Sequence, residues 1–568
     1  MKKTYLFILI TLFYANISSS QSLDWVNSLG GLQDEIARDL AVDTFGNIYI
    51  VGQFRDTVDF DPGSGTVNQT SNGNADVFIL KLDNSGAFIW VRTFGGTGAD
   101  NATAIKVEDS GSIVVVGNFN DTVDFDPSAG NATTTSNGAN DSYLLKMSDS
   151  GNYQFHRTFG GSGNDFINDI VVDYNNDYIV TGKFVNTVDF DPSAGVLNFT
   201  SGSTESDIFV MKISWSSGSL IWAKQFIGNS TTRDSAGTSI GVDLNNNVFI
   251  GGYYAGTVDF DPNAGVANES STDLRNIFIS KLNQNGNFVF VKVISNDNRN
   301  DRVRDIKLDY NNNILAVGDF QGTNVDFDPG SGISNLSGNG ATNVPFLLKL
   351  NNNGDFVWAK EFKPLGSVNN GFAVAVDPSN NAYVSGQYSI QIDLDPGPNT
   401  TNAGTIGAAD AFMVKLNEMG DFVWGKRFGG ANNDTPYAMK FINNKIYQVG
   451  RYNGTADFDP EAPNVYETSN GGYDFFVQRI SENTLSVSDF TTDRIKIFPN
   501  PTPQYIVVDG IPEFNYEIVS LEGKLIMKGK YVSNQIKIDV SGLVSGIYII
   551  EINSLDNDQK IIHKIIKQ

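Results

Sequence analysis

Residues 57–65 read TVDFDPGSG, and this stretch decides the fold because it recurs. Asp-Phe-Asp-Pro returns five more times, and one further copy has leucine in place of phenylalanine. The first aspartates of successive copies lie 64 to 70 residues apart. A long, nearly constant period indicates one supersecondary unit copied in tandem. The copies begin at Asp59, Asp124, Asp189, Asp259, Asp326, Asp393 and Asp457.

Each unit contains four short apolar runs with the pattern of β-strands. The runs are rich in Val, Ile, Tyr, Phe and Trp, and Gly, Asn and Asp bound them. Hairpin-length links join the first run to the second and the third to the fourth. In the first unit the runs are residues 37–42, 47–52, 76–82 and 88–94. The sequence therefore predicts an all-β protein in which residues 23–480 form a seven-bladed β-propeller with four-stranded blades.

The two ends of this repeat complement each other. The last unit lacks a fourth strand, whereas residues 24–31 (DWVNSLGG) resemble residues 89–96 (IWVRTFGG). We therefore expect the N-terminal strand to complete the last blade and close the ring, which removes the exposed sheet edges of an open array. The alternative is an open solenoid with a frayed first strand.

The segments outside the repeat suggest an exported protein. Residues 1–20 combine Lys2 and Lys3, an apolar run at 5–15 and three serines, which is typical of a signal peptide. The apolar run is too short for a membrane anchor, which needs roughly 20 residues. Residues 481–493 are expected to be a linker. Residues 494–568 are expected to form a small β-sandwich.

The repeats resemble a bacterial propeller family known as SBBP. The resemblance covers residues 23–480 and rests on NIYIVG at 47–52 and DVFILKLDNSGAFIWVRTFGG at 76–96. It implies a propeller and no fixed activity. The Phe-Gly-Gly ending of the fourth strand is kept in some units and lost in others.

The C-terminal residues are similar to the type A C-terminal sorting domain of the type IX secretion system. The landmarks are FPNPT at 498–502, a hairpin at Gly523 and GIY at 546–548. The resemblance implies that the type IX machinery is a partner through residues 494–568. It also implies a location at the outer cell surface or outside the cell, after removal of the signal peptide and sorting domain. The alternative is an ordinary accessory β-sandwich.

The amino-acid composition excludes several kinds of functional site and partner. The absence of cysteine excludes disulfides, thiolate metal sites and a cysteine nucleophile. A net charge of −25 disfavours nucleic acid and anionic membranes as partners. The two histidines are His156, expected to pack within a blade, and His563 in the sorting domain. This argues against a Ser-His-Asp triad.

We therefore predict a binding or adhesion module with no catalysis of its own. In a four-stranded blade the long connections, such as residues 62–75 and 95–101, emerge at one face. That long-loop face is the expected surface for a glycan or protein ligand. The alternative is a carbohydrate-active enzyme that uses carboxylates on the same face.

The repeated aspartates admit two interpretations. An extended chain would place both carboxylates of a copy on one side and the apolar residue on the other, and calcium suits such oxygen ligands. The favoured interpretation is a structural turn in which aspartate caps the backbone, which needs no metal. The candidates are Asp59 and Asp61, Asp124 and Asp126, Asp189 and Asp191, Asp259 and Asp261, Asp326 and Asp328, Asp393 and Asp395, and Asp457 and Asp459.

Overall fold

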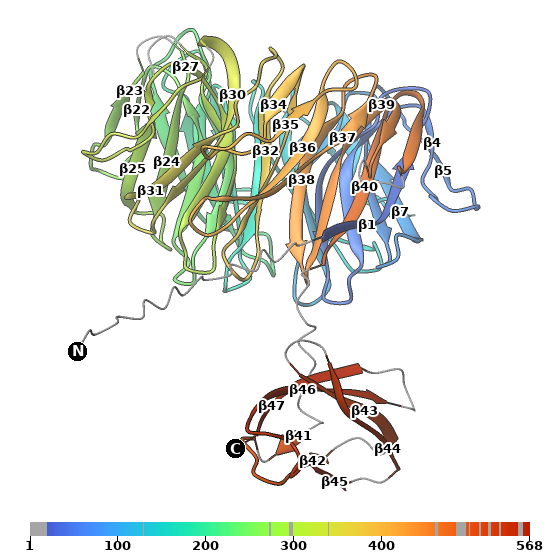
Figure 1. Cartoon of the computed structure of the whole chain (residues 1–568). Helices are drawn as coiled ribbons and strands as arrows, with labels where there is room; N and C mark the ends of the chain where they lie inside the picture. Colours follow the sequence, from blue (N-terminus) through green and yellow to red (C-terminus); the bar gives the residue numbers. More distant parts are fainter. Residues whose placement is uncertain are drawn as a thin grey trace, which may run out of the picture. The chain divides into compact units, whose positions relative to one another are not determined.

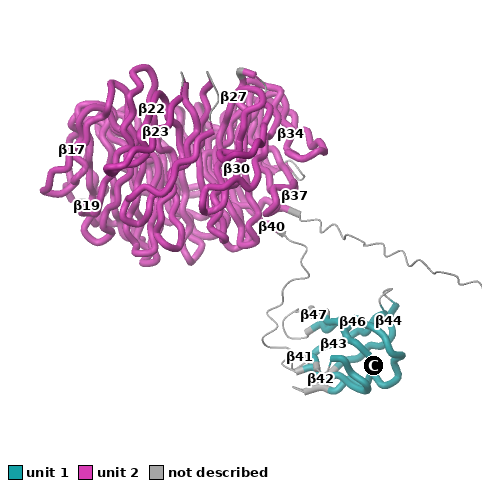
Figure 2. The backbone as a smooth tube through the Cα atoms, turned by 90° about the vertical axis from the view of Figure 1, so that its left-hand side faces the viewer, with its two compact units in different colours: residues 1–20, 483–568 teal, residues 21–482 magenta. Residues whose placement is uncertain are grey.

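The protein divides into two compact units, residues 21–482 and a C-terminal unit from residue 483 onward (Figure 2). The structure is a computed structural model. The expected signal peptide lies outside the described residues except for Ser20. The structure describes residues 20–128, 130–271, 274–294, 299–338, 340–459, 464–483, 496–498, 500–509, 513–520, 524–532, 535–554 and 560–567.

Four-stranded antiparallel sheets repeat along the larger unit (Figure 1). The first contains β2 (Ile36–Val42), β3 (Ile48–Phe54), β6 (Asp76–Leu82) and β7 (Phe88–Phe94), in that order. These are the four strands that the sequence predicted for the first unit.

The next five groups of four strands have the same strand order, and two of these groups also pair with strands of the following repeat. Among the described residues there is no helix, and therefore none that could cross a membrane. The strands are β8 (Asn101–Val107), β9 (Ile113–Phe119), β12 (Asp141–Met147) and β13 (Tyr153–Phe159); β14 (Phe166–Val172), β15 (Tyr178–Phe184), β18 (Asp207–Ile213) and β19 (Leu220–Gly228); β20 (Ala236–Val242), β21 (Val248–Tyr254), β24 (Asn276–Leu282) and β25 (Phe288–Ile294); β26 (Arg302–Leu308), β27 (Ile314–Gly322), β30 (Gly340–Leu350) and β31 (Phe356–Glu361); and β32 (Asn370–Val376), β33 (Ala382–Tyr388), β36 (Asp410–Leu416) and β37 (Phe422–Gly430).

The remaining strands combine the two ends of this unit. β38 (Thr435–Ile442), β39 (Lys445–Asp457) and β40 (Tyr466–Asn483) come from its C-terminal end. β1 (Ser20–Leu29) lies beside β40, where Figure 1 shows it in blue next to orange. Asp24 of β1 pairs with Lys445 at 3.0 Å and with Arg479 at 2.8 Å. The N-terminal strand thus takes the fourth position of the last sheet.

The first strands of the sheets pack against one another in chain order, from β2 through β8, β14, β20, β26 and β32 to β38. β38 also packs against β2. Apolar clusters fill the space between neighbouring sheets; for example, Phe94 of β7 contacts Phe125 and Tyr143 of the second sheet. Such face-to-face packing of aromatic and branched side chains supplies most of the stabilisation. The arrangement is propeller-like.

The link between the second and third strands folds as a small hairpin in most repeats. In the first it comprises β4 (Thr57–Asp59) and β5 (Asn68–Thr70), with the hydroxyls of Thr57 and Thr70 2.7 Å apart. Phe60 follows β4, is fully buried, and packs on Phe78. The equivalents are β10 (Thr122–Asp124) with β11 (Thr133–Thr135), β16 (Thr187–Asp189) with β17 (Asn198–Thr200), β22 (Thr257–Asp259) with β23 (Asn268–Ser270), β28 (Val325–Asp326) with β29 (Asn335–Leu336), and β34 (Gln391–Asp393) with β35 (Asn402–Gly404).

These hairpins have a structural role. The second-to-third links were expected to emerge at a ligand-binding face, and that expectation stays a prediction. The buried apolar residue of each copy holds the link against the sheets, because its burial removes a large side chain from water. Much of each long link therefore builds the blade.

The end of the larger unit differs slightly from the expected boundary. β40 continues to Asn483, so the first three residues of the range 481–493, which was predicted to be a linker, belong to this strand. Glu482 is buried and accepts hydrogen bonds from Trp424 Nε1 at 3.0 Å and from Lys415 Nζ. These bonds hold the strand end against the preceding sheet. Residues 484–493 lie outside the described residues.

The C-terminal unit consists of two sheets around their own core. One sheet contains β41 (Lys496–Phe498), β42 (Tyr505–Asp509) and β45 (Gln535–Asp539). The other contains β44 (Leu525–Val532), β43 (Glu513–Ser520), β46 (Gly546–Ser554) and β47 (Lys560–Lys567). Ile506, Ile538, Ile518 and Ile550 belong to one buried cluster that spans both sheets. This is the small two-sheet unit that the sequence predicted.

Candidate functional site

The repeated aspartates lie at the tips of the small hairpins, where backbone amides hold them. Asp59 Oδ1 accepts hydrogen bonds from the N–H groups of Asp61 at 3.1 Å and Val67 at 2.8 Å. Asp61 Oδ1 accepts one from Gly63 at 2.8 Å. The first aspartate makes the same two contacts in every copy, at Asp124, Asp189, Asp259, Asp326, Asp393 and Asp457.

The second aspartate repeats its turn contact at Asp126, Asp191, Asp261, Asp328 and Asp395. A side-chain oxygen that accepts the N–H two residues later forms an Asx turn, which needs no cation. Within the described residues, no group of three or more His, Asp or Glu side chains is arranged to hold a metal ion. Calcium binding by these residues stays a prediction that requires a titration.

Removal of the two aspartates should have unequal effects. Asp59→Ala leaves two N–H groups without an acceptor and is expected to cost about 1–3 kcal/mol of unfolding free energy, whereas Asp61→Ala should cost about 1 kcal/mol or less. Chemical denaturation of both variants measures the difference. Equal effects, together with a calcium-dependent rise of the unfolding temperature that Asp59→Ala abolishes, would instead establish a metal site.

His156 has a packing role. Its ring stacks on Phe125 with centroids 4.6 Å apart. Nε2 lies 2.8 Å from the Thr134 hydroxyl, and Nδ1 lies 2.9 Å from the Tyr153 hydroxyl. Burial lowers the pKa of His156, which keeps the ring neutral near pH 7. The sequence-based expectation of a blade-packed histidine is confirmed.

A cluster of charged side chains occupies the centre of the larger unit, where the first strands of all the sheets meet. Each first strand contains a β-bulge, and the bulged residues line a cavity of about 100 Å³. A bulge redirects a side chain without ending the strand. The bulged residues are Arg38, Thr103, Asn168, Thr238, Arg304, Phe372 and Tyr437.

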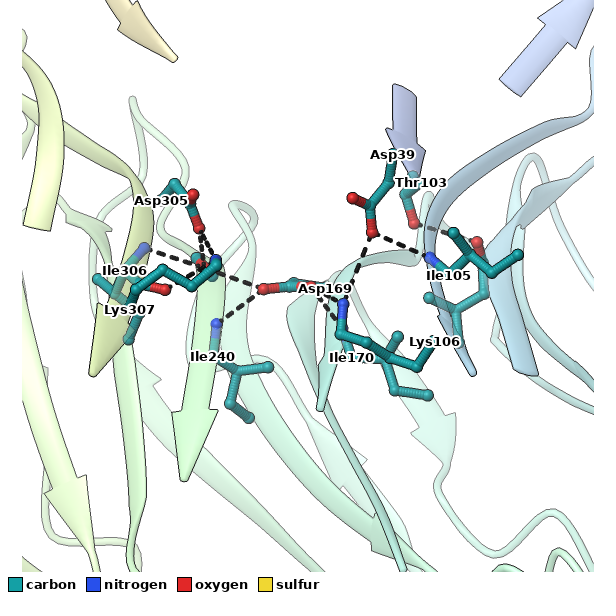
Figure 3. Close-up of polar contacts among 12 residues, drawn as sticks. Asp39, Thr103, Ile105, Lys106, Asp169, Ile170, Ile240, Asp305, Ile306 and Lys307 are labelled. Carbon is teal, nitrogen blue, oxygen red and sulfur yellow. Dashed lines mark hydrogen bonds and ion pairs between the residues drawn. The ribbon is translucent and has the colours of Figure 1, made fainter. Parts of the chain in front are cut away.

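Three aspartates follow these bulges, and lysines pair with them (Figure 3). Lys106 Nζ lies 3.6 Å from both Asp39 and Asp169. Lys307 pairs with Asp305. Burial alone would raise the pKa of Asp39, yet the nearby lysines and backbone N–H groups lower it. Asp39 is therefore ionised in the folded protein, and each of the three carboxylates has a lysine beside it.

A hydrogen-bonded serine links the network between blades. Ser239 Oγ lies 2.9 Å from Asp169 Oδ2 and 3.0 Å from Asp305 Oδ1. Asp169 also accepts the Ile240 N–H at 3.0 Å. Because these residues come from three neighbouring first strands, the network joins adjacent sheets around the centre. Each carboxylate oxygen described above already contacts a hydroxyl, an N–H group or a lysine. This arrangement favours a role in holding the strands together over a role in proton transfer.

A second cavity, of about 360 Å³, opens at one end of this centre. Its walls are Ile240, Ile306 and other apolar side chains, while Lys106, Asp169 and Lys307 supply its polar part. All five of these residues are labelled in Figure 3, where Asp169 lies between Lys106 and Lys307. Tyr174, Leu244 and Tyr310, on the links between first and second strands, line the cavity as well.

These three large side chains are mostly exposed to solvent. Tyr174 is 62% exposed, Leu244 65% and Tyr310 64%. Large apolar groups that gather at a cavity mouth mark an interaction site more often than isolated ones do. This surface was not predicted from the sequence, because the ligand was expected on the long-loop face. The available signal was the repeated pattern Asp-Tyr/Leu-Asn-Asn at 173–176, 243–246 and 309–312.

Buried acid pairs form another repeated feature of the sheet junctions. Gly429 lacks a side chain where a Cβ would lie 2.6 Å from Asp434 Oδ2 and 3.0 Å from Asp410 Cγ, and its φ is +148°. Both aspartates are buried. Equivalent pairs lie beside the Gly-Gly sequences that end three other fourth strands, at 30–31, 95–96 and 160–161. They are Glu35 with Asp474, Asp76 with Asp100, and Asp141 with Asp165.

The junctions that lack Gly-Gly also lack the acid pair. Their counterparts are Asp207 with Ser235, Asn276 with Asp301, and Val344 with Asn369. Glycine is thus kept where two carboxyl groups must approach the backbone. Burial, together with the nearby Asp410 charge, raises the pKa of Asp434 to about 7, and burial raises the pKa of Asp410 to about 6.

The acid pairs should make stability depend on pH. A carboxyl group with a raised pKa keeps a proton in the folded state that the unfolded chain has lost, so its stabilising effect is present below about pH 4 and disappears as pH rises through the folded pKa. The unfolding temperature should therefore fall between pH 5 and pH 8. Asp434→Asn should reduce that fall, measured by calorimetry at both values. An unchanged pH slope in the variant would contradict this assignment.

The C-terminal unit resembles a known family of domains. Residues 496–568 match the family described as secretion system C-terminal sorting domain. This segment is a type IX sorting domain. It indicates export through the type IX machinery to the cell surface or the extracellular space. The sequence-based identification of this domain is confirmed, although the match begins two residues later than predicted.

The chain is also similar, at low identity, to two other proteins, one of which is described as a WD repeat-containing protein. An uncharacterized WD repeat-containing protein, L264 of Acanthamoeba polyphaga mimivirus, is 23% identical over 512 residues, which covers 77% of this chain and 36% of that protein. The regulatory protein FlaEY of Caulobacter vibrioides is 27% identical over 172 residues, or 30% of this chain and 17% of that protein. The chain therefore spans about a third or less of the length of these relatives. The repeat similarity agrees with a propeller-like fold.

A solved structure was also matched. It is that of PorZ, described as an essential bacterial surface component of the type-IX secretion system of Porphyromonas gingivalis. The alignment covers 96% of this chain and 100% of that chain at 10% identity, with a TM-score of 0.15. A TM-score this low supports no inference about the present chain.

Proposed function

We propose that residues 23–480 form a closed, seven-bladed propeller of the SBBP type that acts as a binding or adhesion module at the cell surface. The signal peptide at residues 1–20 starts its export, and the sorting domain directs it across the outer membrane. The pairing of β1 with β40 and the packing of β38 on β2 support closure of the ring. The sorting domain supports the surface location.

One observation carries the binding role. Tyr174, Leu244 and Tyr310 expose most of their surface around a 360 Å³ cavity, although each lies on a short, ordered link. Exposure of this kind costs solvation free energy unless a ligand covers the side chains. The central carboxylates argue against catalysis, because lysines and backbone N–H groups already pair with them.

Cell adhesion provides the test of this role. Cells that display the full chain and cells that lack it are passed over immobilised glycans and extracellular proteins, and the retained cells are counted. The proposal predicts that loss of the chain reduces retention on at least one surface. Equal retention on every surface would contradict it. Release of reducing sugar from the glycans by the purified full chain would favour the carbohydrate-active alternative.

A further inference from the structure

We propose that the apolar collar around the cavity mouth, defined as Tyr174, Leu244 and Tyr310, binds a neutral oligosaccharide. This inference rests on the proposed binding function and gives it a site and a ligand class. The collar lies on three adjacent sheets, each of which contributes one exposed side chain from the link between its first and second strands.

The cavity has room for more than one sugar unit. The volume at the collar is about 360 Å³, and a neighbouring cavity of about 550 Å³ is lined by Tyr310, Pro378 and residues 441–444. Tyr310 thus borders both cavities. Cavities of this size are typical of small-ligand sites. Two adjoining cavities with a shared aromatic residue suit an extended chain of rings better than a single small molecule.

The charges of the lining select a neutral ligand. Lys106 lies between Asp39 and Asp169, and Lys307 pairs with Asp305. Asp309 forms an ion pair with Lys349, with Oδ2 and Nζ 2.9 Å apart. Because each of these charges already has a partner of opposite sign, an anionic or cationic ligand would gain little from them and would lose its hydration.

The collar offers the two kinds of contact that a saccharide uses. Aromatic faces can cover the apolar C–H face of a sugar ring, while the hydroxyl groups need hydrogen-bond partners at the edges. Asn312 lines the first cavity, and Asn443 and Asn444 line the second. Apolar walls with amide groups at the rim fit a ring with alternating apolar and polar faces.

The collar is held rigidly although it is exposed. Asp309 Oδ1 accepts N–H groups from Asn311 at 2.9 Å and Asn313 at 2.8 Å, which fixes the turn. Asn380 Oδ1 of the next sheet accepts the Tyr310 N–H at 2.9 Å.

The Tyr174 link has the same design. Asp173 fixes its turn, and Lys212 pairs with Asp173 at 2.6 Å. Asn246 Oδ1 of the next sheet accepts the Tyr174 N–H at 2.9 Å. A rigid aromatic side chain loses little conformational entropy on binding, so these contacts preorganise the site.

Calorimetric titration of the purified full chain with neutral hexasaccharides of glucose and of N-acetylglucosamine tests the site. We expect at least one to bind, and Tyr310→Ala to weaken that binding at least about tenfold because Tyr310 borders both cavities. Tyr174→Ala should also weaken it. Phe45→Ala is the matched control, because Phe45 is 85% exposed on the equivalent link of the first sheet and lines neither cavity.

A second variant separates preorganisation from contact. Asn380→Gly keeps the positive φ of this residue and removes the amide that holds Tyr310, so affinity should fall while the unfolding temperature changes little. Binding that survives Tyr310→Ala and Tyr174→Ala unchanged, or binding only of anionic oligosaccharides such as those of hyaluronan, would overturn the inference. Cell retention on protein surfaces alone would also overturn it, while the binding function itself would stand.

Discussion

A chain that lacks residues 21–30 is expected to unfold many degrees below the intact protein and to form oligomers. The deletion removes β1 from the last sheet and exposes the edge of β40. It also removes Leu29, which is 2% exposed within the cluster shared with Phe60 of the first sheet. Loss of a buried leucine side chain alone costs about 2–5 kcal/mol, and an unpaired strand edge promotes association. Calorimetry and size-exclusion chromatography measure both effects.

A single substitution gives a milder form of the same test. Leu29→Ala should destabilise the protein by about 2–5 kcal/mol, whereas Leu32→Ala, at a position that is 77% exposed, should change stability by less than about 0.5 kcal/mol. Ring closure by the N-terminal strand would be contradicted if the variant that lacks residues 21–30 stayed monomeric and unfolded at the same temperature as the intact protein.

Removal of residues 494–568 should abolish surface display while leaving the larger unit, residues 21–482, folded. The sorting domain has its own buried cluster, which includes Ile518 and Ile550, and residues 21–482 form a separate compact unit. Loss of the domain therefore removes the export signal and leaves the hydrophobic core of residues 21–482 intact. Protease treatment of intact cells, followed by fractionation, should find the truncated protein protected and in the periplasm.

The collar variant Tyr310→Ala is the control for this experiment, because its substitution lies in an exposed link and leaves the sorting domain unchanged. It should reach the surface as the intact chain does. Protease-sensitive, surface-exposed truncated protein would show that residues 494–568 are not the export signal.

Local sequence pattern predicted the strands well because each is a short β-branched and aromatic run between turn residues. Residues 76–82 and 88–94 coincide with β6 and β7. The role of Phe60 also followed from its place between two aspartates, since alternation in an extended chain separates apolar from polar side chains. These features depend on neighbours within about ten residues, which a sequence displays directly.

The central network and the collar depend on distant parts of the chain. Asp39, Asp169 and Asp305 lie close together because bulges in three separate first strands direct them toward one centre. The local sequence does not predict these bulges. Tyr310 was overlooked because its link has hairpin length, which indicates a turn and not a ligand. The pairing of Gly429 with two buried acids likewise required the structure.

The cavity and its collar depend on closure of the proposed ring, because their side chains come from many sheets around one centre. Hydrogen–deuterium exchange of the full chain measures this closure, with amides of residues 22–29 in β1 compared with those of 88–94 in β7. We expect similar strong protection in both segments, because each is the fourth strand of a sheet. Exchange of residues 22–29 at the rate of an unfolded peptide, while residues 88–94 stay protected, would contradict closure of the ring.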